Sequence, residues 1–424
     1  MDYKKITFKN GLRLILIRKP GSLASSVLVL VEAGSEYETK KINGVSHFLE
    51  HMMFKGTTNR PRVGQIAEEL TGLGAQFNAF TSQEYTGYWA KAESHKLPKI
   101  FDIVSDLYLN PVFNDGEIEK ERGVIAEEIH LRRDDNPMAE APYLLLKLLY
   151  GDQPAGWDVA GTKEILKRIK KREIVDYRTK HYVAPKTVVV IAGKFNEKKI
   201  KAQTKSYFGG LYRSPSIRKF KTKESNQKKP AIDVKFKASG QSHMALGIRA
   251  FDMFDSRRYA LLVLADILGG GMSSRLFKKI REEMGAAYYV GADADLNLDH
   301  GYLAVSAGVD HEKSEKVLGA ILGELRRLRD ENVPEAELRR AKDHLIGNLI
   351  IGLETSDELA GFYGEQEILT RKMLPPEKLI DRIQGIKAGD IRKVARTVFK
   401  NDRLNLAIIG PYKNKGKFNK IFKL

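Results

Sequence analysis

Two histidines and a glutamate stand close together in the segment His47-Phe48-Leu49-Glu50-His51, a combination that can bind a metal ion and transfer a proton. On a helix, His47 and His51 lie one above the other on the same face, and Glu50 projects close to that face. Imidazole nitrogens are common zinc ligands, and a carboxylate that does not bind the metal can take a proton from a nearby water molecule. The segment therefore offers two ligands and a general base.

Two histidines at this spacing also occur by chance, packed against a core and hydrogen-bonded to the backbone. For five residues in a chain of 424, this structural explanation is nearly as good as metal binding. A catalytic zinc site needs three protein ligands and one open position. The choice between the two interpretations therefore depends on a third ligand elsewhere in the chain.

A third ligand is offered by a predicted helix over residues 115–133, which carries several glutamates. Most of them are expected to be solvated, but Glu121 and Glu128 return to the same helix face, beside isoleucines of the apolar side. Glu127 is rotated from Glu128 by about 100° on an ideal helix. A carboxylate beside apolar side chains needs a partner when it is buried, and a metal ion is one such partner.

The elements that position these residues form two similar halves. In the first half, alternating and β-branched patterns predict strands over 12–18, 26–32, 75–81, 85–90 and 187–192, with helices over 44–54, 62–71, 95–108 and 115–133. In the second half they predict strands over 231–237, 243–248, 286–294, 301–308 and 405–409, with helices over 256–268, 313–332 and 334–352. The order of elements in the second half repeats that of the first.

Two pairs of segments carry this repeat: 117–129 aligns with 337–349, and 44–56 aligns more weakly with 259–271. In the second copy, Leu262 and Asp266 stand where the first copy has its two histidines, and Asn348 stands in place of Glu128. A duplicated fold that has kept one metal site explains this pattern. We therefore predict that only the first half binds a metal ion.

These motifs together resemble the pitrilysin family of zinc metallopeptidases, which includes insulin-degrading enzyme and the mitochondrial processing peptidases. The spacing His-x-x-Glu-His is the inverted zinc-peptidase motif, and Glu128 follows it at a distance that fits the distant glutamate ligand of the family. The resemblance spans essentially the whole chain and rests on the segments 47–57, 78–81, 121–128, 274–277 and 281–288.

The resemblance implies a role for each matching residue in the first half. His47, His51 and Glu128 would bind zinc. Glu50 would be the general base, and Glu121 would hold a ligand in its orientation without binding the metal. The implied cofactor is therefore Zn²⁺, bound only in the first half.

The resemblance also implies contacts with a peptide substrate. Asn78 and Ala79 would lie on a strand edge where an extended peptide adds as a further strand. Arg281 and Tyr288, in the second half, would reach the peptide near the scissile carbonyl and stabilise the developing negative charge. Without the resemblance, the simpler interpretation is a surface arginine and a core tyrosine.

The fold implied by the resemblance is α+β, with two homologous domains that each contain an antiparallel β-sheet covered by helices. The polar, basic stretch before Pro230 predicts a linker, so we expect a zinc-binding catalytic domain over 1–213, a linker over 214–230 and a metal-free, substrate-contacting domain over 231–424. Full-length family members join four such domains around a chamber. We therefore expect two subunits to pair, as a homodimer or as a heteromer with a metal-free sister chain, and to hydrolyse short or unfolded peptides.

Composition narrows the alternatives. The chain has no cysteine, so a zinc site must use histidines and carboxylates. Its formal net charge of +18 is spread over lysines and arginines that are scattered among acidic residues, so a nucleic-acid partner is not expected. The same charge predicts a preference for acidic or neutral peptides over strongly basic ones. No apolar run has the length of a membrane span, and the N-terminal residues lack a signal pattern, which predicts a cytoplasmic location and no membrane partner. A non-catalytic scaffold subunit remains the main alternative to a peptidase.

Overall fold

The computed structural model of the chain describes residues 3–214 and 217–424. They form two compact units, which are described separately. Unit 1 comprises Met1–Ile129, Asp158–Phe220 and Ile350–Pro376, and unit 2 comprises His130–Trp157, Lys221–Leu349 and Glu377–Leu424. The border between Phe220 and Lys221 falls within the predicted linker 214–230, of which 215–216 lie outside the described residues.

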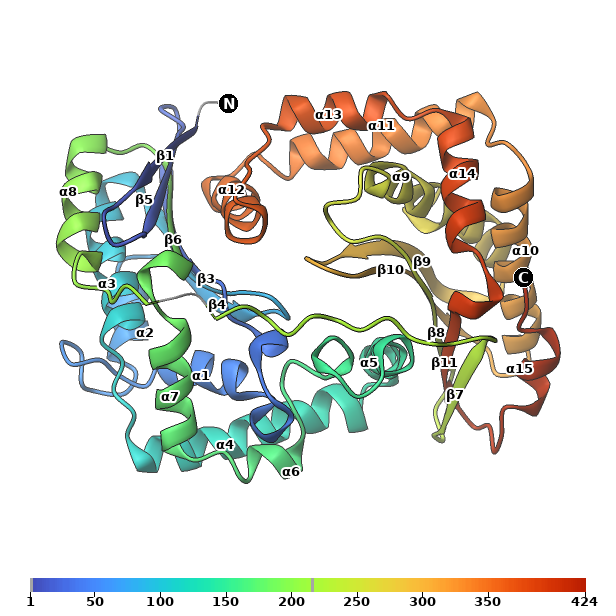
Figure 1. The fold of residues 1–424 in the computed structure, drawn as a ribbon, viewed down its shortest axis with the longest axis horizontal. Coiled ribbons are helices and arrows are strands. Elements are labelled where there is room, and N and C mark those ends of the chain that lie inside the picture. The colour runs from blue at the N-terminus through green and yellow to red at the C-terminus, as the bar shows by residue number, and fades with distance from the viewer. Residues whose placement is uncertain (1–2, 215–216) are drawn as a thin grey trace. The chain divides into compact units, whose positions relative to one another are not determined.

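Unit 1 is built on a six-stranded sheet in the order β1-β2-β6-β3-β5-β4 (Figure 1). Neighbouring strands are antiparallel except for β2 and β6, which are parallel. The central strand β6 has the sequence TVVVIAG and is buried throughout, as expected for a strand covered on both faces. The strands are β1 (Tyr3–Thr7), β2 (Arg13–Arg18), β3 (Ala24–Val31), β4 (Gln76–Thr81), β5 (Thr86–Glu93) and β6 (Thr187–Gly193).

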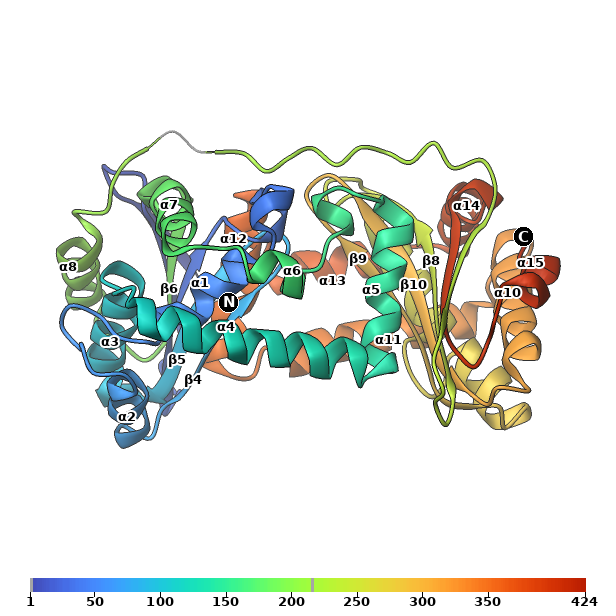
Figure 2. The ribbon, with the colours of Figure 1, turned by 90° about the horizontal axis from the view of Figure 1, so that it is seen from below.

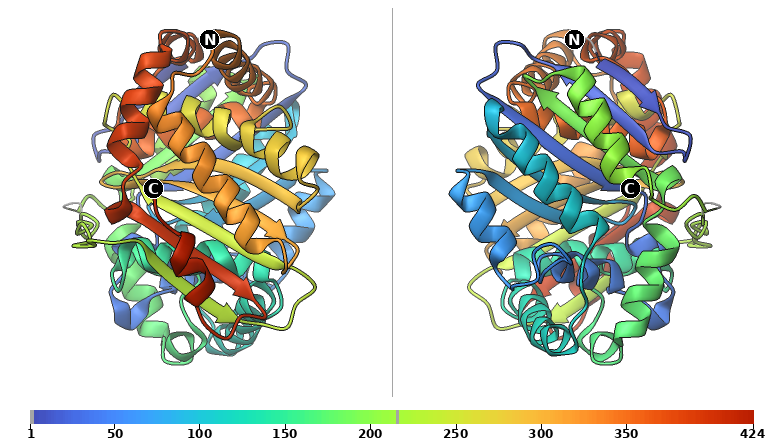
Figure 3. Two further views of the ribbon diagram at one scale, coloured as in Figure 1. Left: turned by 90° about the vertical axis from the view of Figure 1, so that its right-hand side faces the viewer. Right: turned by 90° about the vertical axis from the view of Figure 1, so that its left-hand side faces the viewer.

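Helices cover both faces of the unit 1 sheet. Helix α3 packs on one face against β3 and β5, and α12 packs on the opposite face against β3 and β6; Figure 3 (right) shows α3 and α8 crossing the sheet. Gly364 permits the close approach of α12, because a Cβ atom there would lie 2.7 Å from Leu30 Cδ1. The helices are α1 (Val45–Met53), α2 (Gln65–Gly72), α3 (Leu97–Leu109), α4 (Asp115–Ile129), α6 (Lys163–Leu166), α7 (Lys171–His181), α8 (Glu197–Phe208) and α12 (Ser356–Thr370).

Unit 2 contains a five-stranded sheet in the order β7-β11-β8-β10-β9, with β7 and β11 parallel and the other neighbours antiparallel. Its strands are β7 (Ala231–Phe236), β8 (Ser242–Arg249), β9 (Ala287–Leu296), β10 (Gly301–Val309) and β11 (Leu404–Gly410). Helix α5 packs against β8 and β11, beside the sheet in Figure 2. The helices are α5 (Pro137–Tyr150), α9 (Arg258–Gly269), α10 (Ser314–Asp330), α11 (Glu335–Ile351), α13 (Pro376–Gln384), α14 (Ala388–Val398) and α15 (Gly416–Ile421).

The two sheets repeat one topology, which agrees with the predicted duplication. The order β2-β6-β3-β5-β4 in unit 1 matches β7-β11-β8-β10-β9 in unit 2, including the position of the parallel pair. The α+β class is confirmed, and each sheet adds one parallel pair to the expected antiparallel pattern. Among the described residues, no helix is both long and apolar enough to cross a bilayer.

The helix that covers one sheet face in each unit comes from the other half of the sequence. Helix α12 follows the strands β7 to β10 in the chain but belongs to unit 1, and α5 precedes them but belongs to unit 2. The boundaries predicted from the sequence keep each half contiguous, so the compact units differ from them by the exchange of these two helices. The physical reason is that either sheet can bury the apolar face of such a helix. The sequence pattern alone therefore does not show which sheet the helix covers.

Candidate metal centre

Helix α1, which carries both histidines and the glutamate of the predicted motif, is fixed at its N-terminus. Gly44 precedes the helix with φ of 96°, and a Cβ atom there would lie 2.5 Å from the carbonyl oxygen of Ala160. The fully buried Glu38 carboxylate accepts hydrogen bonds from the backbone N–H groups of Gly44 and Ser46, each at 2.7 Å. A carboxylate at this position satisfies free N–H groups and complements the helix dipole.

Burial raises the pKa of the Glu38 carboxyl to about 7, although its hydrogen bonds to Ser46, Gly44 and Asn43 lower it. Glu38 is tolerated inside the protein because several hydrogen-bond donors surround its carboxyl group. These hydrogen bonds fix the orientation of α1 and therefore of the motif that α1 carries.

Helix α4 packs against α1 (Figure 2) and brings a third candidate ligand to the two histidines. Glu128 Oε2 lies 3.7 Å from His47 Nε2 and 3.5 Å from His51 Nε2. One ligand atom from each of the three residues lies within 4.8 Å of the others. The structure thus brings together the three residues that the sequence analysis assigned to zinc.

The spacing and chemistry of these donors fit a zinc ion. Zinc binds imidazole nitrogen and carboxylate oxygen at about 2.0–2.2 Å, so two ligand atoms of a tetrahedral site lie about 3.3–3.6 Å apart. The observed separations of 3.5 and 3.7 Å are close to that value. Two imidazoles and one carboxylate form a donor set typical of catalytic zinc sites, which leave the fourth position open.

The electrostatics of the site also favour a cation. Burial by itself lowers the pKa of His51, but hydrogen bonds with Glu121 and Glu128 and the nearby charge of Glu50 raise it to about 9. The same carboxylates that stabilise a proton on His51 would stabilise a divalent metal ion in its place. The negative charge around His51 therefore favours a metal ion at this place.

Glu121 orients His51 from the side away from the other ligands. His51 Nδ1 and Glu121 Oε2 are 3.0 Å apart, which places the proton on Nδ1 and leaves Nε2 to face Glu128. Lys55 forms an ion pair with Glu121. Burial raises the pKa of Glu121, but the interactions with His51 and Lys55 outweigh it and lower the pKa below its usual value.

Replacing Glu121 by glutamine is expected to weaken zinc binding about 10–100-fold, because an amide holds the His51 ring and its tautomer less firmly. Competition between the protein and a chromophoric chelator measures this affinity directly. Glu119→Gln, on the exposed side of the same helix, is the matched control and should leave the affinity unchanged. Equal affinities for the two variants would contradict the orienting role.

Glu50 lies beside the ligands and is held by strand β4. Its Oε2 atom accepts a hydrogen bond of 2.6 Å from the Thr81 hydroxyl at the end of the strand. Because β4 is the last strand of the unit 1 sheet, its outer edge has backbone groups available for another strand. Asn78 and Ala79 lie on this edge strand, as expected, and the Asn78 side chain accepts a hydrogen bond from the Ala79 N–H at 2.9 Å.

Arg281 and Tyr288 belong to unit 2, where they contact one another. Arg281 lies in a π-helical segment, Phe277–Glu283, and its Nη1 donates to the carbonyl oxygens of Ala287 and Tyr288 at 2.7 and 2.6 Å. Tyr288 is 68% exposed, so it is not a core residue. The two side chains are accessible within unit 2, and their role toward the metal centre stays a prediction.

The aligned positions of unit 2 hold a hydrogen-bonded network of different composition. His344 Nδ1 lies 2.7 Å from Asp266 Oδ1, and Asn348 Nδ2 lies 3.1 Å from His344 Nε2. An amide replaces the glutamate ligand and an aspartate replaces one histidine. The expectation that only the first half binds a metal ion stays a prediction.

Sequence reasoning missed three residues that support the site. Thr81 holds Glu50, and its signal was present because it ends the family-like segment 78–81. Lys55 pairs with Glu121 and stands one helical turn after His51, a spacing that is also visible in the sequence. Glu38 has no local signal, because its carboxylate reaches the helix through a folded loop.

Comparisons with known proteins agree with the geometry. The model described as Insulinase (Peptidase family M16) matches residues 13–163, and that described as Peptidase M16 inactive domain matches residues 168–345. The curated relative "Uncharacterized zinc protease YmxG" of Bacillus subtilis is 31% identical over 97% of this chain and 99% of its own length. An uncharacterized zinc protease of Streptomyces coelicolor is 31% identical over 97% of this chain and 90% of its own.

Solved structures share the fold. A protease from Helicobacter pylori has a TM-score of 0.92 at 24% identity and covers 97% of this chain and 99% of its own. A putative M16-like peptidase from Alicyclobacillus acidocaldarius has a TM-score of 0.85 at 20% identity, with 96% and 98% covered. The chain therefore belongs to peptidase family M16, the insulinase family, and the resemblance noted from its motifs is confirmed.

Proposed function

We propose that the chain is a zinc-dependent endopeptidase whose centre is His47, His51 and Glu128, with Glu50 as general base. The observation that carries this proposal is the convergence of three ligand atoms within 4.8 Å, next to a carboxylate anchored on an edge strand. Neither a scaffold nor a nucleic-acid binder requires this arrangement. The names of the curated relatives point in the same direction.

Each residue of the centre has a separate role in the proposed hydrolysis of a peptide bond. His47, His51 and Glu128 would hold a zinc ion, which would polarise the scissile carbonyl and acidify a water molecule. Glu50, positioned by Thr81, takes the proton of the attacking water and then returns it to the leaving amine. Glu121 keeps the His51 ring in the tautomer that presents Nε2.

The substrate proposed is a short or unfolded peptide. An extended segment can add to the open edge of β4 beside Asn78 and Ala79, where backbone hydrogen bonds supply most of the recognition. A folded protein does not offer such a free strand without local unfolding. Thr81, which ends the same strand, holds Glu50, so a peptide on this edge runs toward the base.

Arg281 and Tyr288 are proposed to stabilise the negative charge that develops on the scissile carbonyl. They come from the same chain or from a second subunit in a chamber formed by paired chains. The pairing proposed is a homodimer, with a heteromer containing a metal-free sister chain as the alternative. Light scattering after size-exclusion chromatography of the purified chain distinguishes these from a monomer.

Removal of the metal tests the proposed function. Purified protein should hydrolyse a quenched fluorogenic peptide, lose that activity with a chelator and regain it when zinc is restored, because the ligands alone do not activate water. The rate of fluorescence increase is the measurement, and the product masses identify the cleaved bond. Hydrolysis that resists complete zinc removal, or a zinc-loaded protein that cleaves no member of a diverse peptide mixture, would favour the alternatives.

A further inference from the structure

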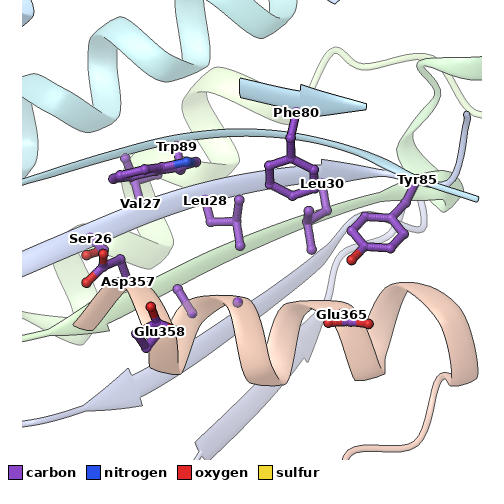
Figure 4. Close-up of a pocket in the computed structure, with 12 residues that line it drawn as sticks. Ser26, Val27, Leu28, Leu30, Phe80, Tyr85, Trp89, Asp357, Glu358 and Glu365 are labelled. Carbon is purple, nitrogen blue, oxygen red and sulfur yellow. The ribbon is translucent and has the colours of Figure 1, made fainter. Parts of the chain in front are cut away.

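A cavity of about 290 Å³ lies in unit 1 between strands β3, β4 and β5 and helix α12 (Figure 4). On one side are aromatic and aliphatic side chains of the sheet, and on the other are carboxylates of α12. The volume is at the lower limit for ligand pockets, so it suits one long side chain better than a whole small molecule. The polar and aromatic lining consists of Ser26, Phe80, Tyr85, Trp89, Asp357, Glu358 and Glu365.

Strand alternation places this cavity next to the proposed site of catalysis. Thr81, which holds Glu50, points to one face of β4, and the preceding residue Phe80 points to the opposite face, into the cavity. Asn78 lies directly opposite Trp89 on the neighbouring strand, so their side chains share the face with Phe80. A peptide added to the edge of β4 therefore directs alternate side chains toward the cavity, close to the scissile bond.

The sheet side of the cavity offers a surface for an apolar stem. Phe80 is 36% exposed and Trp89 is half-buried, although both belong to a sheet face whose aliphatic residues are buried. Aromatic rings also attract a cation held over their faces. These rings leave an apolar surface that a long aliphatic chain with a charged end can cover.

The helix side of the cavity carries an excess of negative charge. Asp357 is paired with Lys91 at 2.9 Å. In the part of the chain that the structure describes, no cationic side chain lies within ion-pair distance of the exposed Glu358, and Glu365 adds a further carboxylate to the lining. Because Lys91 neutralises only Asp357, the exposed carboxylate of Glu358 leaves this side of the cavity negative.

We propose that this cavity is a specificity subsite that binds a lysine or arginine side chain of the peptide substrate close to the scissile bond. The aliphatic stem lies on Trp89 and Phe80, and the cationic end lies among the carboxylates of α12. The proposal deepens the proposed peptidase function and rests on it for the identity of the ligand. It also opposes the expectation that a chain of charge +18 avoids basic peptides, because contact within the pocket outweighs charges screened over about 10 Å.

Binding to a full-length, zinc-loaded Glu50→Gln variant separates this subsite from catalysis. The probes are fluorescent peptides with no other charged side chain, in which arginine is moved through successive positions and each peptide is compared with norleucine at the same position. Fluorescence anisotropy should show tighter binding for arginine at one position, by about tenfold, as expected for a partly desolvated cation on aromatic rings. Lysine should give a smaller gain at that position, and glutamate should weaken binding.

Variants locate the preference in the cavity. The double substitution Glu358→Gln and Glu365→Gln should reduce the arginine preference to less than about threefold, whereas the matched pair Glu68→Gln and Glu119→Gln, both exposed elsewhere in unit 1, should leave it intact. Gly361→Leu provides a second route, because a Cβ atom at Gly361 meets nothing within 4 Å and leucine suits a helix. Its side chain should fill part of the cavity and weaken binding of the arginine peptide.

The outcomes distinguish the subsite from the peptidase. An arginine preference that persists in both cavity variants, or its absence at every position, overturns the subsite while cleavage by the parent protein still supports the peptidase. A pocket-dependent preference without cleavage by the zinc-loaded parent supports the subsite and overturns the peptidase. Failure of every peptide to bind the Glu50→Gln variant overturns the subsite, and failure of the zinc-loaded parent to cleave any of them overturns the peptidase as well.

Discussion

Replacement of Glu50 by glutamine is expected to lower kcat by about 10²–10⁴-fold while the bound zinc stays unchanged, because this range is typical of general acid–base catalysis. Glutamine has nearly the size of glutamate, and its carbonyl oxygen can accept the hydrogen bond from Thr81. It cannot take a proton from water at neutral pH. The measurements are kcat for a fluorogenic peptide and zinc content by elemental analysis of the same sample.

Two further variants define the origin of this loss. Glu127→Gln makes the same change of charge at an exposed position of α4 and should leave kcat unchanged. Thr81→Val removes the hydroxyl that orients Glu50 and should cause a smaller loss than Glu50→Gln itself. A Glu50→Gln protein that retains most of its activity would show that another group accepts the proton.

Replacement of Glu128 by glutamine is expected to remove the metal rather than the base. The carboxylate lies 3.7 and 3.5 Å from the facing nitrogens of His47 and His51 and supplies the only negative charge among the three ligands. Zinc affinity should therefore fall by more than the roughly 10–100-fold expected for loss of an outer partner. A competition titration measures the affinity, and peptide hydrolysis should fall in parallel.

Glu127→Gln is again the matched control, since it changes the neighbouring residue on the same helix by the same chemistry. Circular dichroism of both variants should match the parent protein, which separates metal loss from unfolding. Zinc bound to Glu128→Gln as tightly as to the parent would require a different third ligand. Activity restored by excess zinc would instead agree with the weakened site.

Local periodicity predicted the elements that carry the motif. The helix expected over 44–54 is observed as Val45–Met53, since the spacing of apolar residues and the flanking glycines define it locally. The helix expected over 115–133 is α-helical over Asp115–Ile129 and continues as a π-helical turn over His130–Asp134. The face shared by Glu121 and Glu128 follows from helical spacing alone, so the sequence is enough to group these two residues.

The contacts between distant segments of the chain were not predicted from the sequence. Helices α5 and α12 were not predicted, and their exchange between the two units depends on which sheet buries each apolar face. The parallel pairs β2–β6 and β7–β11 join segments that are distant in the chain, so no turn sequence predicts that these strands pair. The cavity proposed as a subsite cannot be predicted for the same reason, since Phe80 and Glu358 line one cavity only when α12 lies on the first sheet.

The sequence by itself determined the chemistry of the centre: two imidazoles and a base on one helical turn, and a carboxylate on the matching face of a second helix. These features are local, because a helix repeats every 3.6 residues whatever surrounds it. Only the tertiary structure decided that α4 lies against α1, that Glu38 and Thr81 hold the motif, and that an acidic helix faces an aromatic strand. Those contacts arise from packing between distant segments, whose partners are selected by burial and shape rather than by spacing along the chain.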